Sequence, residues 1–342
     1  MNNAHNHEQP QLNIENLQQS TKKYASSETK KSIIQIVDSF LPYLLLWIVA
    51  IVILRRGVSI WFLPIITTLM LVFYFRIFII FHDCCHHSFF TSSTANKIVG
   101  TLFGILTFTP YQSWAREHIT HHATVADLDR RGIGDITTWT VNEYLVASKW
   151  KKFAYRVYRN PLVLFGIGPI WVFFILHRLP QRVSGRGVRN SIIITNLALA
   201  AILVIASISI GVKTYLWIQV PVIYFGGMIG IWLFYVQHQF EPANWYRHEE
   251  WDFKKAALYS SSYYKLPGIL QWITGNIGLH HVHHSNARIP NYKLQACLDN
   301  TSLLQEIKPL SIRSSLKTIK LSLWDENKNT LVSFREIRGQ YT

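Results

Sequence analysis

Residues 58–87 read VSIWFLPIITTLMLVFYFRIFIIFHDCCHH. The apolar part, 58–81, is long enough to cross a bilayer as a helix, because a span needs roughly 17 to 25 residues. Its one charge, Arg76, lies near the end of the block, where we expect the side chain to reach toward the membrane surface. Three histidines follow directly: His82, His86 and His87. The stretch predicts a membrane helix that ends in a cluster of potential metal ligands.

Three further apolar blocks complete a set of four predicted spans. They cover residues 37–54, 191–211 and 215–236. A short connection joins the first block to 58–81, and another joins the last two, so the spans form two hairpins. Hydrophobic residues make up 49% of the chain and charged residues only 15%. This pattern is typical of an all-α integral membrane protein.

Two shorter apolar pieces lie between the hairpins. Residues 98–109 are too few to span, and residues 162–176 are marginal and contain two glycines and a proline. We expect both to be interfacial or re-entrant. The membrane domain would then cover 37–295. It follows a polar arm, 1–36, expected to be cytosolic and partly disordered, and precedes a basic cytosolic segment, 296–342.

The formal net charge of +15 has two interpretations. A positive charge of this size would favour binding to nucleic acid. However, the basic residues lie in segments that flank apolar blocks, where positive loops are retained in the cytoplasm. We therefore expect no nucleic-acid partner, and both termini and the loop between the hairpins in the cytoplasm. The pair Arg55 and Arg56, in the first hairpin turn, opposes this bias. The cysteines form no spaced disulfide framework, which favours a reducing compartment.

The 15 histidines avoid the predicted spans and gather after them. With four spans, every cluster falls on the same side of the membrane. In a helix, the spacing i, i+3, i+4 places three residues on one face. Two triplets have this spacing: His118, His121 and His122, then His280, His283 and His284. His281 would point elsewhere, whereas His238 follows the fourth span.

These clusters predict a shared metal site with more than one ion. A histidine-rich surface loop is the alternative for any one cluster, and lone histidines such as His177 and His248 are more typical of structural roles. Eight or nine imidazoles exceed the four ligands of one zinc ion, so we expect two metal ions. Imidazole suits zinc, copper, iron and nickel alike. No H-E-x-x-H or E-x-x-H pattern occurs.

The text around the histidines resembles the membrane-bound fatty acid desaturase family, with its three histidine boxes, and in particular the bacterial acyl-lipid branch. The resemblance covers about residues 75–295. The matching stretches are FHDCCHHSFF at 81–90, HITHHAT at 118–124 followed by DLDRRG at 127–132, YVQHQFE at 235–241, and NIGLHHVHH at 276–284.

This resemblance implies a four-helix membrane domain of the bacterial inner membrane, with a helical cytosolic cap that holds two iron ions. Such a site activates dioxygen and removes two hydrogens from an acyl chain of a membrane lipid. No catalytic residue separate from the metal ligands is implied. His86 and His87 compete for one ligand position, and the i, i+4 spacing from His82 favours His86. The implied ligands are His82, His86, His118, His121, His122, His238, His280, His283 and His284.

Other groups near the boxes have supporting roles in this interpretation. Carboxylates that would orient the imidazoles, unless they are solvated or pair with arginines, are Asp83, Glu117, Asp127, Asp129, Asp135 and Glu241. We find no G-x-G-x-x-G fingerprint after a strand and no haem-binding domain. The two electrons must therefore come from a separate protein such as a ferredoxin. The basic face would attract an acidic donor, and would equally suit anionic lipid.

Two other functions compete with desaturation. Related di-iron hydroxylases and ketolases carry similar histidine boxes, so the boxes alone do not select the reaction. A metal transporter would also use histidines, but transporters place polar ligands near the middle of their spans. The four predicted spans contain no Asp, Glu or His at that depth. The sequence therefore favours an enzyme.

Overall fold

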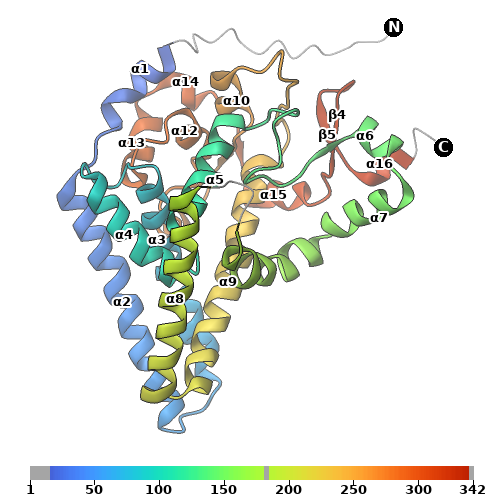
Figure 1. The fold of residues 1–342 in the computed structure, drawn as a ribbon. Helices are drawn as coiled ribbons and strands as arrows, with labels where there is room; N and C mark the ends of the chain where they lie inside the picture. The colour runs from blue at the N-terminus through green and yellow to red at the C-terminus, as the bar shows by residue number, and fades with distance from the viewer. Residues whose placement is uncertain (1–15, 181–184, 339–342) are drawn as a thin grey trace, which may run out of the picture.

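The computed structural model describes residues 16–180 and 185–338. Within these ranges, four helices are long and apolar enough to cross a membrane. They are α2 (Thr29–Arg55), α3 (Phe62–Cys85), α8 (Arg186–Ser209) and α9 (Val212–His238). In Figure 1 they extend below a cap of shorter helices, and the two hairpin turns lie at the far end. The predicted fold class, four spans in two hairpins under a helical cap, is confirmed.

The spans differ in extent from the apolar blocks that predicted them. Helix α2 begins at Thr29, well before residue 37, and α3 and α9 continue to Cys85 and His238. Apolar side chains mark only the part of a helix that suits lipid. Backbone hydrogen bonding continues into the cap, where tertiary packing stabilises the extra turns. These extensions carry His82 and His238 into the cap.

A polar contact joins the first two spans. The Arg76 side chain is buried and forms a 2.7 Å ion pair with Asp38 of α2. It also donates to the Ser39 hydroxyl and to the Trp272 carbonyl oxygen, at 3.0 and 2.8 Å. The expectation that Arg76 reaches the membrane surface is wrong, because α2 supplies a carboxylate beside it and a buried cation is stable when paired.

The N-terminal arm packs on the cap from its first described residue onward. Helix α1 (Leu17–Thr21) and the short 3₁₀ helix Lys22–Tyr24 precede α2. Leu17 is only 2% exposed and belongs to the same apolar cluster as Val282. The part of the predicted arm that the structure describes, residues 16–36, is ordered, because Leu17 buries its apolar side chain against the cap. Residues 1–15 lie outside the described ranges.

The segment between the hairpins supplies one wall of the cap. In chain order it contains α4 (Ser93–Leu106), α5 (Tyr111–Thr124), β1 (Trp139–Thr140), α6 (Val141–Val146) and α7 (Lys149–Tyr158). Two π-helical turns and a 3₁₀ turn follow, at Leu162–Ile167, Ile170–Ile175 and Leu176–Arg178. Helix α7 and these turns bend by 59° at their junction. The bend permits a broken span or a re-entrant segment here, and α4 is not long enough to span.

The chain after α9 forms the opposite wall. Its helices are α10 (Phe253–Tyr259), α11 (Gly268–Ile273), α12 (His280–Ser285), the 3₁₀ turn Asn291–Lys293, α13 (Leu294–Asp299), α14 (Ser302–Gln305), α15 (Ile312–Thr318) and α16 (Phe334–Arg338). The strands are β2 (Tyr263–Tyr264), β3 (Pro309–Leu310), β4 (Leu323–Asp325) and β5 (Thr330–Val332). Strand β4 pairs in parallel with β1 and antiparallel with β5, and β2 pairs in parallel with β3.

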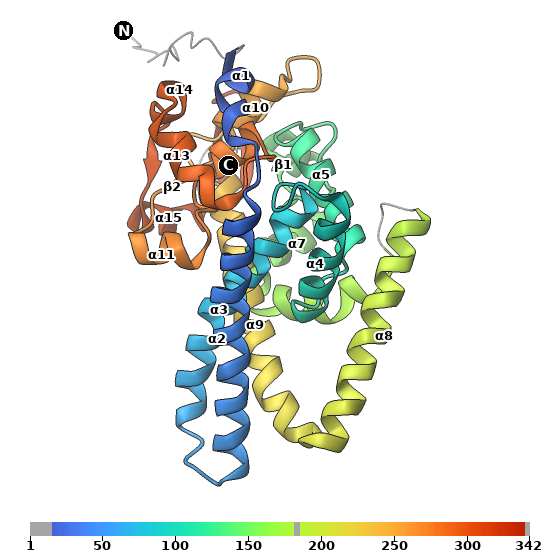
Figure 2. The same cartoon turned by 90° about the vertical axis from the view of Figure 1, so that its left-hand side faces the viewer.

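The C-terminal segment is part of the cap core. Trp324 of β4 is 1% exposed and shares an apolar cluster with Phe240 and Tyr264. Tyr235 of α9 donates from its hydroxyl to the Leu321 carbonyl oxygen at 2.8 Å. Figure 2 shows α13, α14 and α15 on one side of the cap and α4 and α5 on the other. The C-terminal residues therefore help to hold the end of α9 in place.

Candidate metal centre

Nine histidines from four helices converge in the interior of the cap. They come from the end of α3, from α5, from the last turn of α9 and from α12, and all nine are buried. The helical spacing expected for α5 and α12 is therefore present. The nine are His82, His86, His118, His121, His122, His238, His280, His283 and His284.

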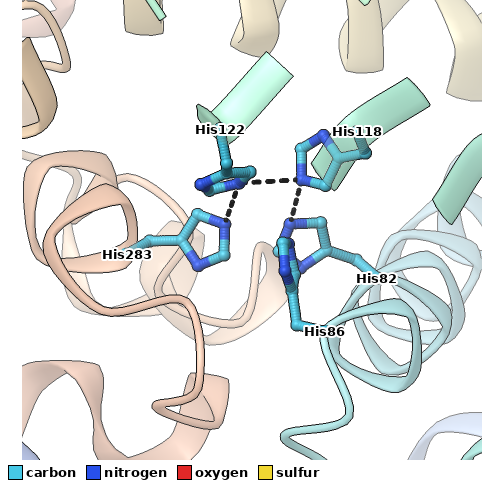
Figure 3. A group of neighbouring side chains, drawn as sticks. All are labelled: His82, His86, His118, His122 and His283. Carbon is cyan, nitrogen blue, oxygen red and sulfur yellow. Dashed lines mark hydrogen bonds between the residues drawn. The ribbon is translucent and has the colours of Figure 1, made fainter. Parts of the chain in front are cut away.

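The first group contains five rings, drawn in Figure 3. Its members are His82, His86, His118, His122 and His283, and their ligand atoms all lie within 4.8 Å of one another. The His118 Nε2 atom is 3.0 Å from that of His82 and 3.2 Å from that of His122. The His283 Nε2 atom is 3.0 Å from that of His122. Five nitrogens therefore surround one small volume.

The second group contains His121, His238, His280 and His284, with the same limit on the ligand-atom distances. The His238 Nε2 atom is 3.1 Å from that of His121 and 2.9 Å from that of His280. The two groups share helices α5 and α12. The i, i+4 pair His118 and His122 serves the first group, whereas the i+3 residue His121 turns to the second.

In helix α12 the assignment is reversed: the i, i+4 pair serves the second group and the i+3 residue serves the first. His280 and His284, four residues apart, serve the second group, and His283 serves the first. Residues i and i+4 lie nearly above one another on a helix, whereas i+3 is rotated to the side. Two helices that each carry the H-x-x-H-H pattern can therefore bridge two adjacent sites.

The second group shows which ring nitrogen carries the proton. The His121 Nδ1 atom contacts the Asp135 carboxylate, and the His238 Nδ1 atom lies 3.2 Å from the Ser260 carbonyl oxygen. Both partners are acceptors, so both Nδ1 atoms donate and both Nε2 atoms present lone pairs. The lone pairs of these two Nε2 atoms, whose nuclei are 3.1 Å apart, repel each other unless both atoms coordinate a cation. The donor set of this group therefore fits a metal ion.

Buried nitrogens without a partner support the same interpretation. His86 Nε2 and His284 Nε2 are buried and have no hydrogen-bond partner within the described chain. An unpaired buried acceptor is costly, and metal coordination would satisfy it. Burial, and then the neighbouring imidazoles, lower the pKa of His118, His122 and His283 well below the ordinary value. The rings are thus held neutral, which is the form that binds metals.

Outer contacts orient the first group as well. The His82 Nδ1 atom lies 3.3 Å from Asp83 Oδ1. Asp83 Oδ2 accepts from the Asn291 backbone and side-chain nitrogens at 2.7 and 2.8 Å. The Asn291 amide exchanges two hydrogen bonds with Gln35 of α2. Sequence reasoning missed Asn291, Gln35 and Ser260, because nothing in the local pattern brings them to the histidines.

Only two of the six predicted orienting carboxylates contact a histidine of the two groups, namely Asp83 and Asp135. Asp127 instead pairs with Arg130 and with His248, and Asp129 pairs with Arg247. In the described chain, Glu117 and Glu241 form no hydrogen bond with the nine histidines. For Asp127 and Asp129 the structure therefore favours the alternative of arginine pairing, and Glu117 and Glu241 do not orient these rings.

The other histidines of residues 16–180 and 185–338 lie outside the two groups. His87 is exposed and has a left-handed backbone φ of 53°, so the helix has ended before it. His281 is fully buried, and its Nε2 atom lies 3.2 Å from the Leu304 carbonyl oxygen. His177 and His248, taken as structural, contact the Phe108 carbonyl oxygen and Asp127. The structure thus places His86, and not His87, beside His82.

The fold and the site define a membrane protein with four membrane-capable helices and two buried groups of histidines that could hold metal ions. Its sequence identifies the class further. The model of the family described as fatty acid desaturase matches residues 58–305. The chain therefore belongs to the fatty acid desaturase family, whose members are oxidoreductases, as the resemblance in the histidine boxes implied.

Relatives in several organisms agree with this assignment. A fatty acid desaturase of Bacillus subtilis is 44% identical over 315 residues, which cover 92% of this chain and 89% of that protein. An sn-1 acyl-lipid omega-3 desaturase (ferredoxin) of a Synechocystis strain is 27% identical over 250 residues, covering 68% of this chain and 66% of its own length. The protein of the same description in a Nostoc strain is 27% identical over 283 residues, covering 77% and 73%.

Proposed function

We propose that this desaturase introduces a double bond into the acyl chains of membrane lipids, using dioxygen at a centre of two iron ions. The observation that carries the metal assignment is the opposition of the His121 and His238 lone pairs, with both Nδ1 protons already engaged. The lipid substrate is inferred from the Synechocystis and Nostoc relatives, which are described as acyl-lipid desaturases.

Each group of histidines would hold one iron. The first would use the five rings His82, His86, His118, His122 and His283, and the second would use His121, His238, His280 and His284. Bound irons would supply the redox chemistry that removes hydrogen from an unactivated methylene, which side-chain acids and bases cannot do. The chain's own part is to hold the rings neutral and to orient them.

Burial of the nine rings has a second function in this proposal. The walls of the cap keep bulk water from the ligands. The outer partners of His82, His121 and His238 keep their Nε2 atoms aimed inward. Asp135 and Asp83 act as positioning residues, since each contacts a ligand histidine at Nδ1 and leaves its Nε2 for the metal. Carboxylate partners also raise the basicity of a ligating imidazole. The site thus combines neutral ligands with anionic support behind them.

The reaction needs two electrons from another protein. The Synechocystis and Nostoc relatives are described with ferredoxin. We infer that a ferredoxin also serves this chain. The net charge of +15 would favour encounter with a small acidic protein. Raising the ionic strength should therefore slow electron delivery before it affects metal content.

The orientation in the membrane follows from the even number of spans. Both termini and the histidine groups then share one side, which the positive-inside rule assigns to the cytoplasm. We place the protein in a bacterial inner membrane. The catalytic unit in this proposal comprises about residues 37–295. Described residues of the segments before and after it pack against this unit. A fifth crossing through the bent segment at α7 would place His238, the histidines of α12 and the C-terminus on the opposite side of the membrane from the N-terminus. Labelling of both termini tests this arrangement.

Lipid analysis tests the reaction directly. The chain would be expressed in a host that lacks desaturases, together with a ferredoxin and its reductase, and the acyl chains would be analysed by mass spectrometry. We expect new acyl chains lighter by two hydrogens that depend on oxygen. A gain of one oxygen atom would instead assign a hydroxylase. Purified protein without iron would contradict the proposed cofactor.

A further inference from the structure

A separate cavity of about 590 Å³ lies outside the two histidine groups. It is formed by α4, α5, the N-terminal end of α8 and the turn that follows α3. In Figure 2, α8 diverges from α9 toward this end, and α4 and α5 face it. None of the nine grouped histidines lines the cavity. The cavity is therefore a distinct feature of the cap.

Three cations from three different helices line this cavity: Lys97 of α4, Arg116 of α5 and Arg186 of α8. Among the described residues, no carboxylate lines it, and the His87 side chain adds a polar group. In the described ranges, none of the three cations forms an ion pair with an acidic side chain. Their charge is thus not neutralised by the protein, and the cavity attracts anions.

Helix α5 lines the cavity with two kinds of side chain. Gln112, Arg116 and Thr120 are spaced by four residues, so they follow one face of the helix. Gln112 and Arg116 offer N–H donors, whereas the Thr120 hydroxyl donates to the Arg116 carbonyl oxygen and can accept. Ala115 and Ile119, on the adjoining strip, give an apolar wall. A ligand that fits this lining has an anionic, hydrogen-bonding head and an apolar part.

The apolar surfaces next to the cavity indicate where that apolar part lies. Ile98 and Leu102 of α4 are each more than half exposed, as are Ile193 and Leu197 of α8. Helix α8 is a predicted span, so its exposed apolar side chains face lipid. The cationic cavity therefore lies at the membrane surface, next to the exposed apolar strips of α4 and α8.

We propose that this cavity binds the phosphate headgroup of an anionic phospholipid, with Lys97, Arg116 and Arg186 as the phosphate-binding residues. Its acyl chains lie along the exposed strips of α4 and α8. Arginine suits phosphate because its planar guanidinium donates two parallel hydrogen bonds. The apolar strips favour a lipid over free phosphate, because the latter leaves them unused. Binding at this cavity needs no metal, so its failure would leave the proposed desaturase function intact.

Native mass spectrometry of the purified, metal-loaded full-length protein tests the proposal. The protein is titrated with phosphatidylglycerol, with phosphatidylcholine of the same acyl chains, and with inorganic phosphate. We expect phosphatidylglycerol to bind at least about tenfold more tightly than phosphatidylcholine. Each cation near the membrane surface is worth about a fivefold change in affinity for anionic lipid. The triple variant Lys97→Gln, Arg116→Gln, Arg186→Gln should therefore lose the preference.

A matched control removes the same charge from the other end of the spans. The variant Arg55→Gln, Arg56→Gln, Lys213→Gln alters three exposed cations and should keep the preference. If the cavity variant binds phosphatidylglycerol as the parent does, or if the control loses as much, the proposal is wrong. Equal affinity for inorganic phosphate would also overturn it. Should the triple variant fail to fold, Lys97→Gln alone, at an exposed position, should weaken binding about fivefold.

Discussion

His121 shows how a single ring is prepared for a metal. Asp135 accepts its Nδ1 proton, and α5 fixes the backbone, so the Nε2 lone pair points at His238. Asp83 plays the corresponding part for His82, and Asn291 holds Asp83 in turn. Because the rings are oriented before a metal arrives, their outer partners should influence metal affinity without touching the metal.

We predict that Asp135→Asn weakens metal binding about 10- to 100-fold. The neutral amide is a poorer acceptor than the carboxylate, and it no longer enforces the Nδ1 proton on His121. Metal content measured after dialysis against graded chelator reports the change. Asp299→Asn is the control, because this exposed carboxylate bonds only Gln295. Equal metal retention by all three proteins would refute the positioning role of Asp135.

A second prediction separates ligand histidines from a structural one on the same helix. His283→Ala should remove a ligand of the first group and abolish activity through loss of metal. His281→Ala should keep the metal but lower the free energy of unfolding by about 1 to 3 kcal/mol. That cost arises because the buried ring bonds the Leu304 carbonyl oxygen. Metal analysis and thermal unfolding of both variants measure the two effects.

The two variants should lose different properties: His283→Ala should lose metal, and His281→Ala should lose stability. A fully active, metal-replete His283→Ala enzyme would remove this residue from the ligand set. His87→Ala serves as a surface control, since His87 is exposed at the end of α3, and it should retain the metal content of the parent.

At the scale of elements, close helix packing positions the spans beneath the site. A Cβ atom placed on Gly226 of α9 would lie 2.4 Å from the Tyr74 Cε1 atom of α3. Tyr74 is buried, so its ring has little room to move. One turn further along, a Cβ atom on Gly230 would meet no atom within 4 Å. The two glycines therefore differ in packing although both lie in one apolar helix: Gly226 leaves room for Tyr74, and Gly230 has open space beside it.

This difference gives a third prediction. Gly226→Ala should destabilise the protein by about 1 to 3 kcal/mol, because overpacking pushes α3 and α9 apart. Gly230→Ala should be neutral or slightly stabilising, because alanine favours the helix by up to about 1 kcal/mol over glycine. Thermal unfolding in detergent compares the two. Equal destabilisation by both substitutions would mean that the loss comes from elsewhere than the contact with Tyr74.

At the scale of the whole molecule, the cap encloses nine buried imidazoles in two groups that could each hold a metal ion. Burial lowers the pKa of His118, His122 and His283, so the folded protein resists protonating them. The unfolded chain protonates histidine near pH 6.5. Below that pH the unfolded state binds more protons than the folded state, so stability falls as the pH falls.

We therefore predict that metal-free protein unfolds at progressively lower temperature as the pH decreases from about 7.5 to 5.5. The metal-loaded protein at pH 7.5 should unfold at a higher temperature than the metal-free protein, because a ligand that binds only the folded state stabilises it. Differential scanning fluorimetry across this pH range gives both comparisons. An unfolding temperature of the metal-free protein that does not change with pH would contradict the buried, neutral state of the rings.

Some features followed from local pattern alone. Hydropathy predicted the four spans, and helical periodicity predicted that His118, His121 and His122 share a face and that His281 does not join its neighbours. The family followed from the boxes. The local pattern did not predict where α2 begins or how residues 16–36 fold. Leu17 is stabilised by contacts with residues far along the chain, which a local pattern does not contain.

The sequence by itself determined the membrane class, the gathering of the histidines after the spans and the ligand type that they offer, because hydropathy and ligand type are local properties. Only the tertiary structure decided how the nine rings divide into groups of five and four. It also decided that Asp135 and Asn291 stand behind the site, and that Arg76 pairs with Asp38. These contacts depend on the packing of helices distant in the chain, which no single stretch encodes.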